Sequence, residues 1–179
     1  MNTRDLVLIA LFAAIVVVLG FIPVPITAQS MGVMLAGCIL GARRGALAFL
    51  LFLLLVAIGL PALSGGRGGL AVFAGPSGGF IIGWVVATFV TGLIAQRFVR
   101  EGQAELHQFV GFFLASVLGG IVVLYAIGMP WVSAVTGTPL LAVATGSLAF
   151  LPGDLLKAAI ATLAARAVFA GYPLLPVRA

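Results

Sequence analysis

The chain has 179 residues, of which 63% are hydrophobic and only 7% are charged, and its formal net charge is +5. A soluble globular domain draws roughly a quarter of its residues from Asp, Glu, Lys and Arg. With a mean hydropathy of +1.33, this chain cannot cover itself with a polar surface, so a soluble domain is excluded. We predict an integral membrane protein, organised as a single membrane-embedded domain over 1–179.

The predicted fold class is all-α. The runs LVLIALFAAIVVVLGF and LAFLLFLLLVAIGL are apolar at every position, whereas the strands of a membrane barrel alternate apolar and polar residues. Cys38 has no second cysteine to pair with, and His107 is the one histidine. Neither a disulfide nor a metal site is therefore expected, and no cofactor is expected either.

Six apolar segments, separated by charges and by Gly or Pro, are each predicted to be a transmembrane helix. In chain order they cover residues 6–22, 31–42, 45–60, 79–96, 108–128 and 146–170. The second segment is too short to span alone, unless the preceding PVPITAQ is irregular backbone buried in the protein. The first segment loosely resembles a signal peptide ending near Ala28, but two prolines crowd that junction, so we expect it to be retained.

The arginines indicate how the segments are oriented. Placing Arg4 on the cytoplasmic side and alternating the six segments puts further arginines on that side: Arg43, Arg44, Arg97, Arg100, Arg166 and Arg178. This arrangement follows the positive-inside rule and puts both termini in the cytoplasm. The orientation of the protein in membrane lipid then explains its excess of basic residues. Nucleic-acid binding is therefore not expected.

Two charged residues lie inside the last apolar segment, in FLPGDLLKAAIA. At a rise of 1.5 Å per residue, Lys157 lies about 13 Å and Asp154 about 18 Å from Arg166, well inside a hydrocarbon core about 30 Å thick. Their i, i+3 spacing lets them neutralise each other, and Pro152 and Gly153 predict a helix start whose dipole favours the carboxylate. The pair is either a packing device or the polar floor of a pocket open to the outside.

Two loops predicted on the outer side carry further candidates. In PVPITAQSMG, Thr27 and Gln29 supply hydrogen-bonding side chains, although the prolines alone would also make a rigid turn. In GGRGGLAVFAGPSGGF, glycines permit positive φ, and Phe73 and Phe80 provide apolar surfaces. Arg67 in this loop is either a solvated charge or a group that meets an anionic substrate. No Walker Lys-Ser/Thr pair follows the glycines, which argues against a phosphate-binding loop.

Three stretches together resemble the BioY family, the biotin-specific substrate-capture (S) components of energy-coupling factor (ECF) transporters. PVPITAQSMGVMLAGCILGARRG is similar to that family's first loop and second helix, GRGGLAVFAGPSGGFIIGW to its GPTGGY-centred loop and following helix, and LPGDLLK to its Gly-Asp-x-x-Lys stretch. The resemblance covers about 20–160 in order. Ser77 stands where Thr is usual and Phe80 where Tyr is usual, so a hydroxyl and an aromatic face are kept while a phenol is lost.

The resemblance implies a six-helix protein that captures biotin on the outside and hydrolyses no ATP itself. It implies docking on a transmembrane T component driven by two cytoplasmic ATPase subunits, through an Ala-x-x-x-Ala motif on the first helix that Ala10 and Ala14 match. Biotin is a compact apolar bicycle with a urea and a carboxylate, which calls for apolar walls and a few polar groups. The expected substrate-binding residues are Asp154, Lys157, Arg67, Thr27, Gln29, Phe73, Ser77, Gly78, Gly79 and Phe80.

Polar chemistry suggests roles for three of these residues. Asp154 can accept hydrogen bonds from the urea N–H groups, while Lys157 can donate to the urea oxygen. Arg67 is a candidate for the biotin carboxylate, with Lys157 as the alternative. We expect the two outer loops to close over the bound ligand.

Other classes of protein remain as alternatives. One is an S component for another small vitamin-like anion, and another is an ion or proton channel with the Asp-Lys pair as a relay. A channel needs further ionisable residues, and none lies between Lys157 and Arg166. An intramembrane enzyme needs a nucleophile–base pair or a metal, for which His107 and Cys38 are poor material. The sequence therefore predicts a multi-pass transport protein of the plasma (inner) membrane rather than an enzyme.

Overall fold

A computed structural model describes residues 2–21 and 28–175, and within these ranges every regular element is helical, apart from one isolated β-bridge. The elements are α1 (Thr3–Gly20), α2 (Gln29–Ala57), α3 (Ala71–Ala74), α4 (Gly78–Phe98), α5 (Glu105–Val117), the π-helix η1 (Leu118–Val123), α6 (Leu124–Thr136), α7 (Leu140–Ser147), the 3-10 turn η2 (Leu148–Phe150) and α8 (Leu151–Gly171). The all-α prediction is confirmed for the described residues.

Five helical stretches in the described ranges are long and apolar enough to cross a membrane. They are α1, α2, α4, the rod formed by α5, η1 and α6, and the rod formed by α7, η2 and α8. The sequence predicted six segments. The difference lies in α2, which contains 31–42 and residues 45–57 of the next segment as one helical run with a break at Gly41.

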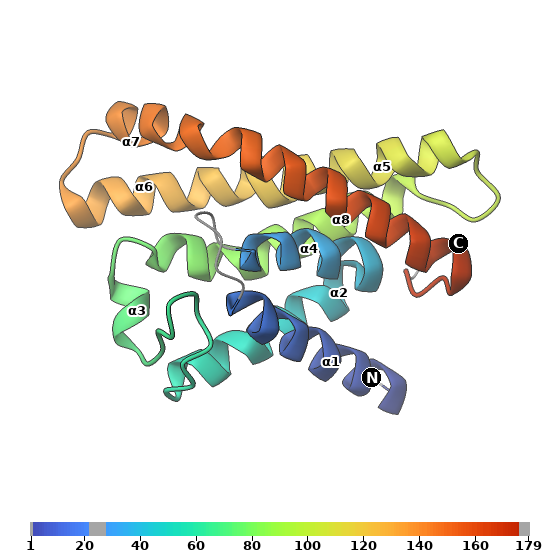
Figure 1. Cartoon of the computed structure of the whole chain (residues 1–179), viewed down its shortest axis with the longest axis horizontal. Helices are drawn as coiled ribbons and strands as arrows, with labels where there is room; N and C mark the ends of the chain where they lie inside the picture. Colours follow the sequence, from blue (N-terminus) through green and yellow to red (C-terminus); the bar gives the residue numbers. More distant parts are fainter. Residues whose placement is uncertain (1, 22–27, 176–179) are drawn as a thin grey trace.

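That break is at Gly41, whose φ of 80° and ψ of −178° are not helical. Positive φ costs glycine little because it has no Cβ, so the chain can change direction there without a loop. Figure 1 shows the two halves of α2 leaving this point in different directions. The second predicted segment therefore corresponds to the first half of α2.

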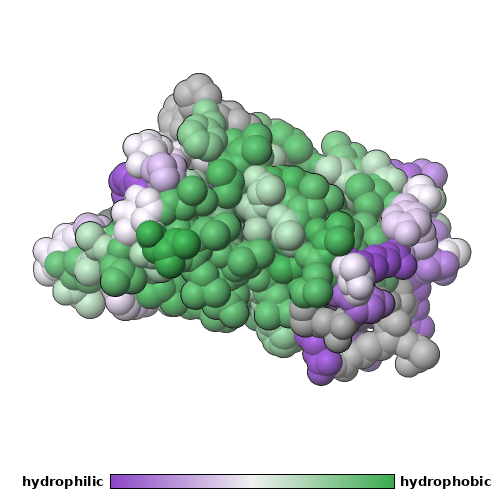
Figure 2. Space-filling view, turned by 90° about the horizontal axis from the view of Figure 1, so that it is seen from below, coloured by the Kyte–Doolittle hydropathy of each residue, from purple (hydrophilic) through white to green (hydrophobic). Residues whose placement is uncertain are grey.

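Helix α2 lies at the centre of the bundle, in contact with α1, α4 and α8. In Figure 1 the α5–α6 rod and the α7–α8 rod run along one side of α2 and α4, and α1 lies on the other. Figure 2, which views the molecule from the α1 side, shows a broad hydrophobic belt with hydrophilic residues gathered mainly toward its ends. This belt fits a protein whose outer surface faces lipid tails.

Glycines let α2 and α4 approach closely. A Cβ built on Gly37 would lie 2.6 Å from the Cβ of Thr91 and 2.9 Å from the carbonyl oxygen of Thr88. Such small-residue contacts are the usual means by which helices pack in membranes, where burial from water contributes little.

We expect Gly37→Ala to lower the free energy of unfolding by about 1–3 kcal/mol, because the added methyl group overpacks this interface. Gly146→Ala is the matched control, since a Cβ there meets nothing within 4 Å. Alanine is the better helix former by about 1 kcal/mol, so the control should leave stability unchanged or raised. Thermal unfolding of both variants in detergent measures the difference, and equal shifts would contradict the packing assigned to Gly37.

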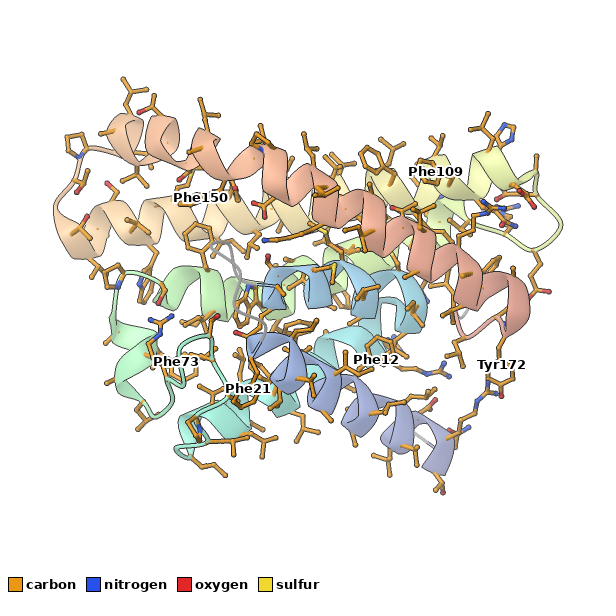
Figure 3. All side chains as sticks on the ribbon, in the orientation of Figure 1. Phe12, Phe21, Phe73, Phe109, Phe150 and Tyr172 are labelled. Atoms are coloured by element: carbon orange, nitrogen blue, oxygen red, sulfur yellow. The ribbon has the colours of Figure 1, made fainter. Side chains whose placement is uncertain are left out.

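Contacts around Arg44 join the two ends of the described chain. Its Nε lies 2.7 Å from Asp5 Oδ1 in α1, and its Nη1 donates to the Leu174 carbonyl at 3.2 Å. The Arg4 guanidinium carbon sits 5.0 Å from the centre of the Tyr172 ring, which is labelled in Figure 3 at the same end as the start of α1. The start of α1 and the segment after α8 therefore lie together at one end of the bundle.

Candidate ligand-binding site

A cavity of about 410 Å³ lies toward the opposite end of the bundle, where α2 and α4 begin. Its volume falls within the roughly 300–1,000 Å³ typical of small-molecule sites. The wall comes from the start of α2 (Gln29, Ser30), the loop after α2 (Leu63, Ser64, Arg67), the start of α4 (Ser77, Phe80, Ile81, Trp84), α6 (Leu124, Tyr125, Val132) and the α7–α8 rod (Val143, Ser147, Phe150, Asp154).

The cavity wall is mostly apolar and includes three aromatic side chains besides Tyr125: Phe80, Trp84 and Phe150. Phe150 lies in the 3-10 turn between α7 and α8, as labelled in Figure 3. The Phe80 ring meets the Tyr125 ring edge to face, with centroids 6.1 Å apart and planes at 89°. Such a wall suits a compact apolar ligand with few polar groups.

The polar corner of the cavity is built around Asp154. Tyr125 Oη donates to Asp154 Oδ2 at 2.6 Å, and Lys157 Nζ donates to Asp154 Oδ1 at 3.0 Å. The same ammonium donates to Ser30 Oγ at 2.9 Å. Asp154 is only 7% exposed, so the carboxylate is held by charge-assisted bonds on both oxygens in a largely water-free setting. The predicted Asp154–Lys157 ion pair is confirmed.

Local sequence explains why the carboxylate lies in this position. Helix α8 begins at Leu151 with Pro152 in its first turn, as the sequence predicted. Proline is favoured there because the first amide groups of a helix have no acceptor within it. Asp154 is the acidic residue of that turn, where the positive end of the helix dipole favours a negative charge.

Arg67 contributes a cation to the cavity wall. Its loop is closed by the Leu63 amide, which donates to the Arg67 carbonyl at 3.0 Å, and by positive φ values at Gly65 and Gly66 of 79° and 69°. The expectation that glycines in this loop permit positive φ is thus confirmed at Gly65 and Gly66, whereas Gly75, Gly78 and Gly79 do not adopt it. Arg67 is exposed and lines the cavity, so an anionic ligand group could pair with it.

The structure brings some predicted site residues together and leaves others apart. Asp154, Arg67, Gln29, Ser77 and Phe80 all line the cavity. The wall does not include Lys157, whose ammonium is bonded to Asp154 and Ser30.

Three predicted residues, Phe73, Gly78 and Gly79, also lie outside the cavity wall. Gly78 and Gly79 are buried against Trp131 at the start of α4, and the Trp131 Nε1 donates to the Gly75 carbonyl at 3.0 Å. Their small size serves close packing, and Phe73 packs against the hydrophobic core. Thr27 lies outside the described residues.

Sequence reasoning missed Tyr125, Ser30 and Trp84. Tyr125 carried a usable signal, because it is one of two tyrosines and lies inside an apolar membrane segment. A phenol hydroxyl there needs a hydrogen-bonding partner, since lipid offers none. The phenol that the sequence lacks at position 80 is thus present at the cavity on a different helix.

Ala10 and Ala14 belong to a different surface. Both are exposed on α1, on the same helix as the exposed apolar side chains of Leu6, Leu11 and Val18. Small residues four apart form a shallow groove that another helix can enter. This surface is separate from the cavity wall.

Comparisons with known proteins identify the family and the fold. The chain is 60% identical to the biotin transporter BioY of Rhizobium etli, with 100% of both chains covered, and 49% identical to that of Rhodobacter capsulatus, covering 92% of this chain and 93% of the relative. A crystal structure of the S component for biotin from an ECF-type ABC transporter superposes with a TM-score of 0.84 at 33% identity, over 95% of each chain. The BioY family model matches residues 1–173, and the chain belongs to the BioY family.

Proposed function

We propose that this protein captures biotin at the outer side of the plasma membrane, as the S component of an ECF-type transporter. The observation that carries the proposal is the Asp154 carboxylate, fixed by Tyr125 and Lys157 at one corner of an otherwise apolar cavity. A urea with two N–H groups matches such an acceptor, and the apolar bicycle of biotin matches the aromatic wall. Two relatives of this chain, 60% and 49% identical to it, are named as biotin transporters.

Within the cavity, Asp154 accepts from the urea N–H groups, while the Lys157 ammonium remains bonded to Asp154 and Ser30. Phe80 and Trp84 contact the bicycle. The biotin carboxylate points toward Arg67, which lines the same cavity. Closure of the outer loops then reduces exchange of the bound ligand with water.

The proposed topology has six crossings, because the two halves of α2 on either side of Gly41 each count as one. The arginine-containing end, where Arg4 and Arg44 contact the segment after α8, is cytoplasmic by the positive-inside rule. Both termini are then cytoplasmic and the cavity faces outward. This orientation is the one that the loop arginines support.

The proposed partners are a transmembrane T component and two ATPase subunits, which hydrolyse ATP on behalf of the assembly. The α1 surface with Ala10 and Ala14 is the proposed docking surface for the T component. Its exposure in the isolated chain supports this role. The protein itself acts as a binding and transport subunit without enzymatic activity of its own.

Purified protein in detergent is expected to bind biotin with a dissociation constant below about 1 µM, because an enclosed site with several fixed hydrogen bonds gives high ligand efficiency. Isothermal titration calorimetry measures the affinity, and a thermal-shift assay shows that the protein is folded. Other small vitamin-like anions, tested in the same way, should bind at least about 100-fold more weakly, because they leave the polar corner unpaired. Folded protein that does not bind biotin at micromolar concentration would rule out the proposed function.

A further inference from the structure

We infer that Gln29 is a positioning residue that acts through Ser64 to hold Arg67 where its guanidinium meets the ligand's carboxylate. The inference rests on the proposed function and deepens it, because it states how the anionic end of the ligand is recognised. It also changes the role expected for Gln29, from a direct ligand contact to a support for another residue.

The Gln29 side chain is only 1% exposed, and its amide joins three parts of the chain. Its Nε2 donates to the Val16 carbonyl of α1 at 3.2 Å and to the Ala62 carbonyl at 2.7 Å. Its Oε1 accepts from the Ser64 amide at 3.0 Å. Both N–H donors of the side chain are therefore used on backbone carbonyls, which leaves neither for a ligand.

Ser64 connects this amide to Arg67. While its N–H donates to Gln29, its carbonyl accepts from Arg67 Nε at 3.2 Å. Within the described part of the chain, this is the one hydrogen bond that the Arg67 side chain makes. Its terminal N–H groups therefore remain available, and these are the groups that bind a carboxylate in bidentate fashion.

Close packing fixes the position of this amide. A Cβ built on Gly20 would lie 2.6 Å from the Ala62 carbonyl oxygen and 2.7 Å from Gln29 Nε2. The end of α1, the start of α2 and the 62–64 loop therefore meet with no room for a side chain at position 20. Through this contact, the position of Arg67 is set by the helical bundle as well as by its own glycine-rich loop.

The test compares biotin with its methyl ester, which keeps the urea and the bicycle but lacks the negative charge. Arg67→Met should raise the biotin dissociation constant by about 10- to 100-fold, as expected for the loss of a charge-assisted pair. Gln29→Met should raise the same constant by about 10-fold, because the loop is no longer held at Ser64. Both variants should change the dissociation constant of the methyl ester by less than about 3-fold. A change of that size is expected between sites that do not interact.

The double variant Gln29→Met with Arg67→Met distinguishes two possibilities. Gln29 either positions Arg67 or contributes to biotin binding independently of it. If Gln29 acts through Arg67, the double variant binds biotin no more weakly than Arg67→Met alone. Fully additive losses, or an equal loss of biotin and methyl ester in Gln29→Met, would overturn the inference. So would an Arg67→Met substitution that weakens biotin and its methyl ester equally, or that weakens neither. If the wild-type protein binds neither ligand, the proposed function fails and the inference fails with it.

If Gln29→Met does not fold, Gly20→Ala is the variant to use. It disturbs the same contact without replacing Gln29 itself. It should weaken biotin more than the methyl ester, and an unchanged ratio of the two constants would count against the inference. Ser116→Ala is the control, because Ser116 is a buried polar residue that contacts Cys38 and does not line the cavity. It should leave the ratio of the two dissociation constants at the wild-type value.

Discussion

Asp154→Asn is expected to weaken biotin binding by more than about 2 kcal/mol, the scale measured when one member of a buried charge pair is truncated. The substitution keeps the shape of the side chain but removes the charged acceptor, and it leaves Lys157 without its counter-ion in a low-dielectric site. Lys157→Met should have a comparable effect, because it leaves the buried carboxylate with Tyr125 as its remaining partner. Calorimetry gives the affinity of each variant, and thermal unfolding gives its stability.

The double variant Asp154→Asn with Lys157→Met tests whether the pair is a ligand site or a packing device. Both possibilities predict recovered stability, because the double variant restores neutrality. If Asp154 is the urea acceptor, affinity stays lost, since an Asn-Met pair provides neither an anionic acceptor nor a cationic donor. Recovered affinity would show that the pair only fixes helix packing.

Arg166→Met is the matched control for this series, because it breaks another ion pair of the same helix. Arg166 pairs with Glu105, a carboxylate whose side chain is 82% exposed. Exposed pairs contribute little because solvent screens them. The control should therefore leave both biotin affinity and stability close to the wild-type values.

Ala10→Trp and Ala14→Trp should each reduce biotin uptake by cells to the background level while leaving the affinity of the purified protein unchanged. A bulky side chain on this face of α1 prevents another helix from approaching closely, and neither alanine lines the cavity. Uptake of labelled biotin, co-purification with the T component and calorimetry together separate docking from capture. Ala167→Trp, on an exposed position of α8, controls for the added bulk at the lipid surface. Variants that lose biotin binding but still co-purify with the T component would reverse the assigned roles.

Much of the helical architecture could be predicted because membrane helices are long and apolar. The ends of the helices were harder to predict, because apolar runs do not show where regular hydrogen bonding stops. The segment predicted over 108–128 belongs to a rod that continues to Thr136, with Pro130 inside the helix. Membrane helices tolerate proline when neighbouring groups satisfy the freed backbone. The division between 31–42 and 45–60 was predicted, but its position at Gly41 and the absence of a loop there were not, because the run remains helical on both sides.

The site shows a similar division between local and distant contacts. The Asp154–Lys157 pair could be predicted because i, i+3 spacing alone places both side chains on one face. Tyr125 and Ser30 meet that pair only through tertiary packing, across 29 and 127 positions of sequence. Gly78 and Gly79 lie in the same motif as Ser77, which lines the cavity, yet they face Trp131. Residues that are adjacent in a sequence motif therefore do not all line the cavity.

The contacts of Arg44 also bear on the order in which the protein is assembled. The side chain binds Asp5, which is 39 positions earlier in the sequence, and the Leu174 carbonyl, which is 130 positions later. Because chains are synthesised from the N-terminus, the pair with Asp5 can form while the later helices are still on the ribosome. The bond to Leu174 can form only when the last helix has been inserted. Arg44 thus links the first helix to be synthesised with the segment of the described chain that is synthesised last.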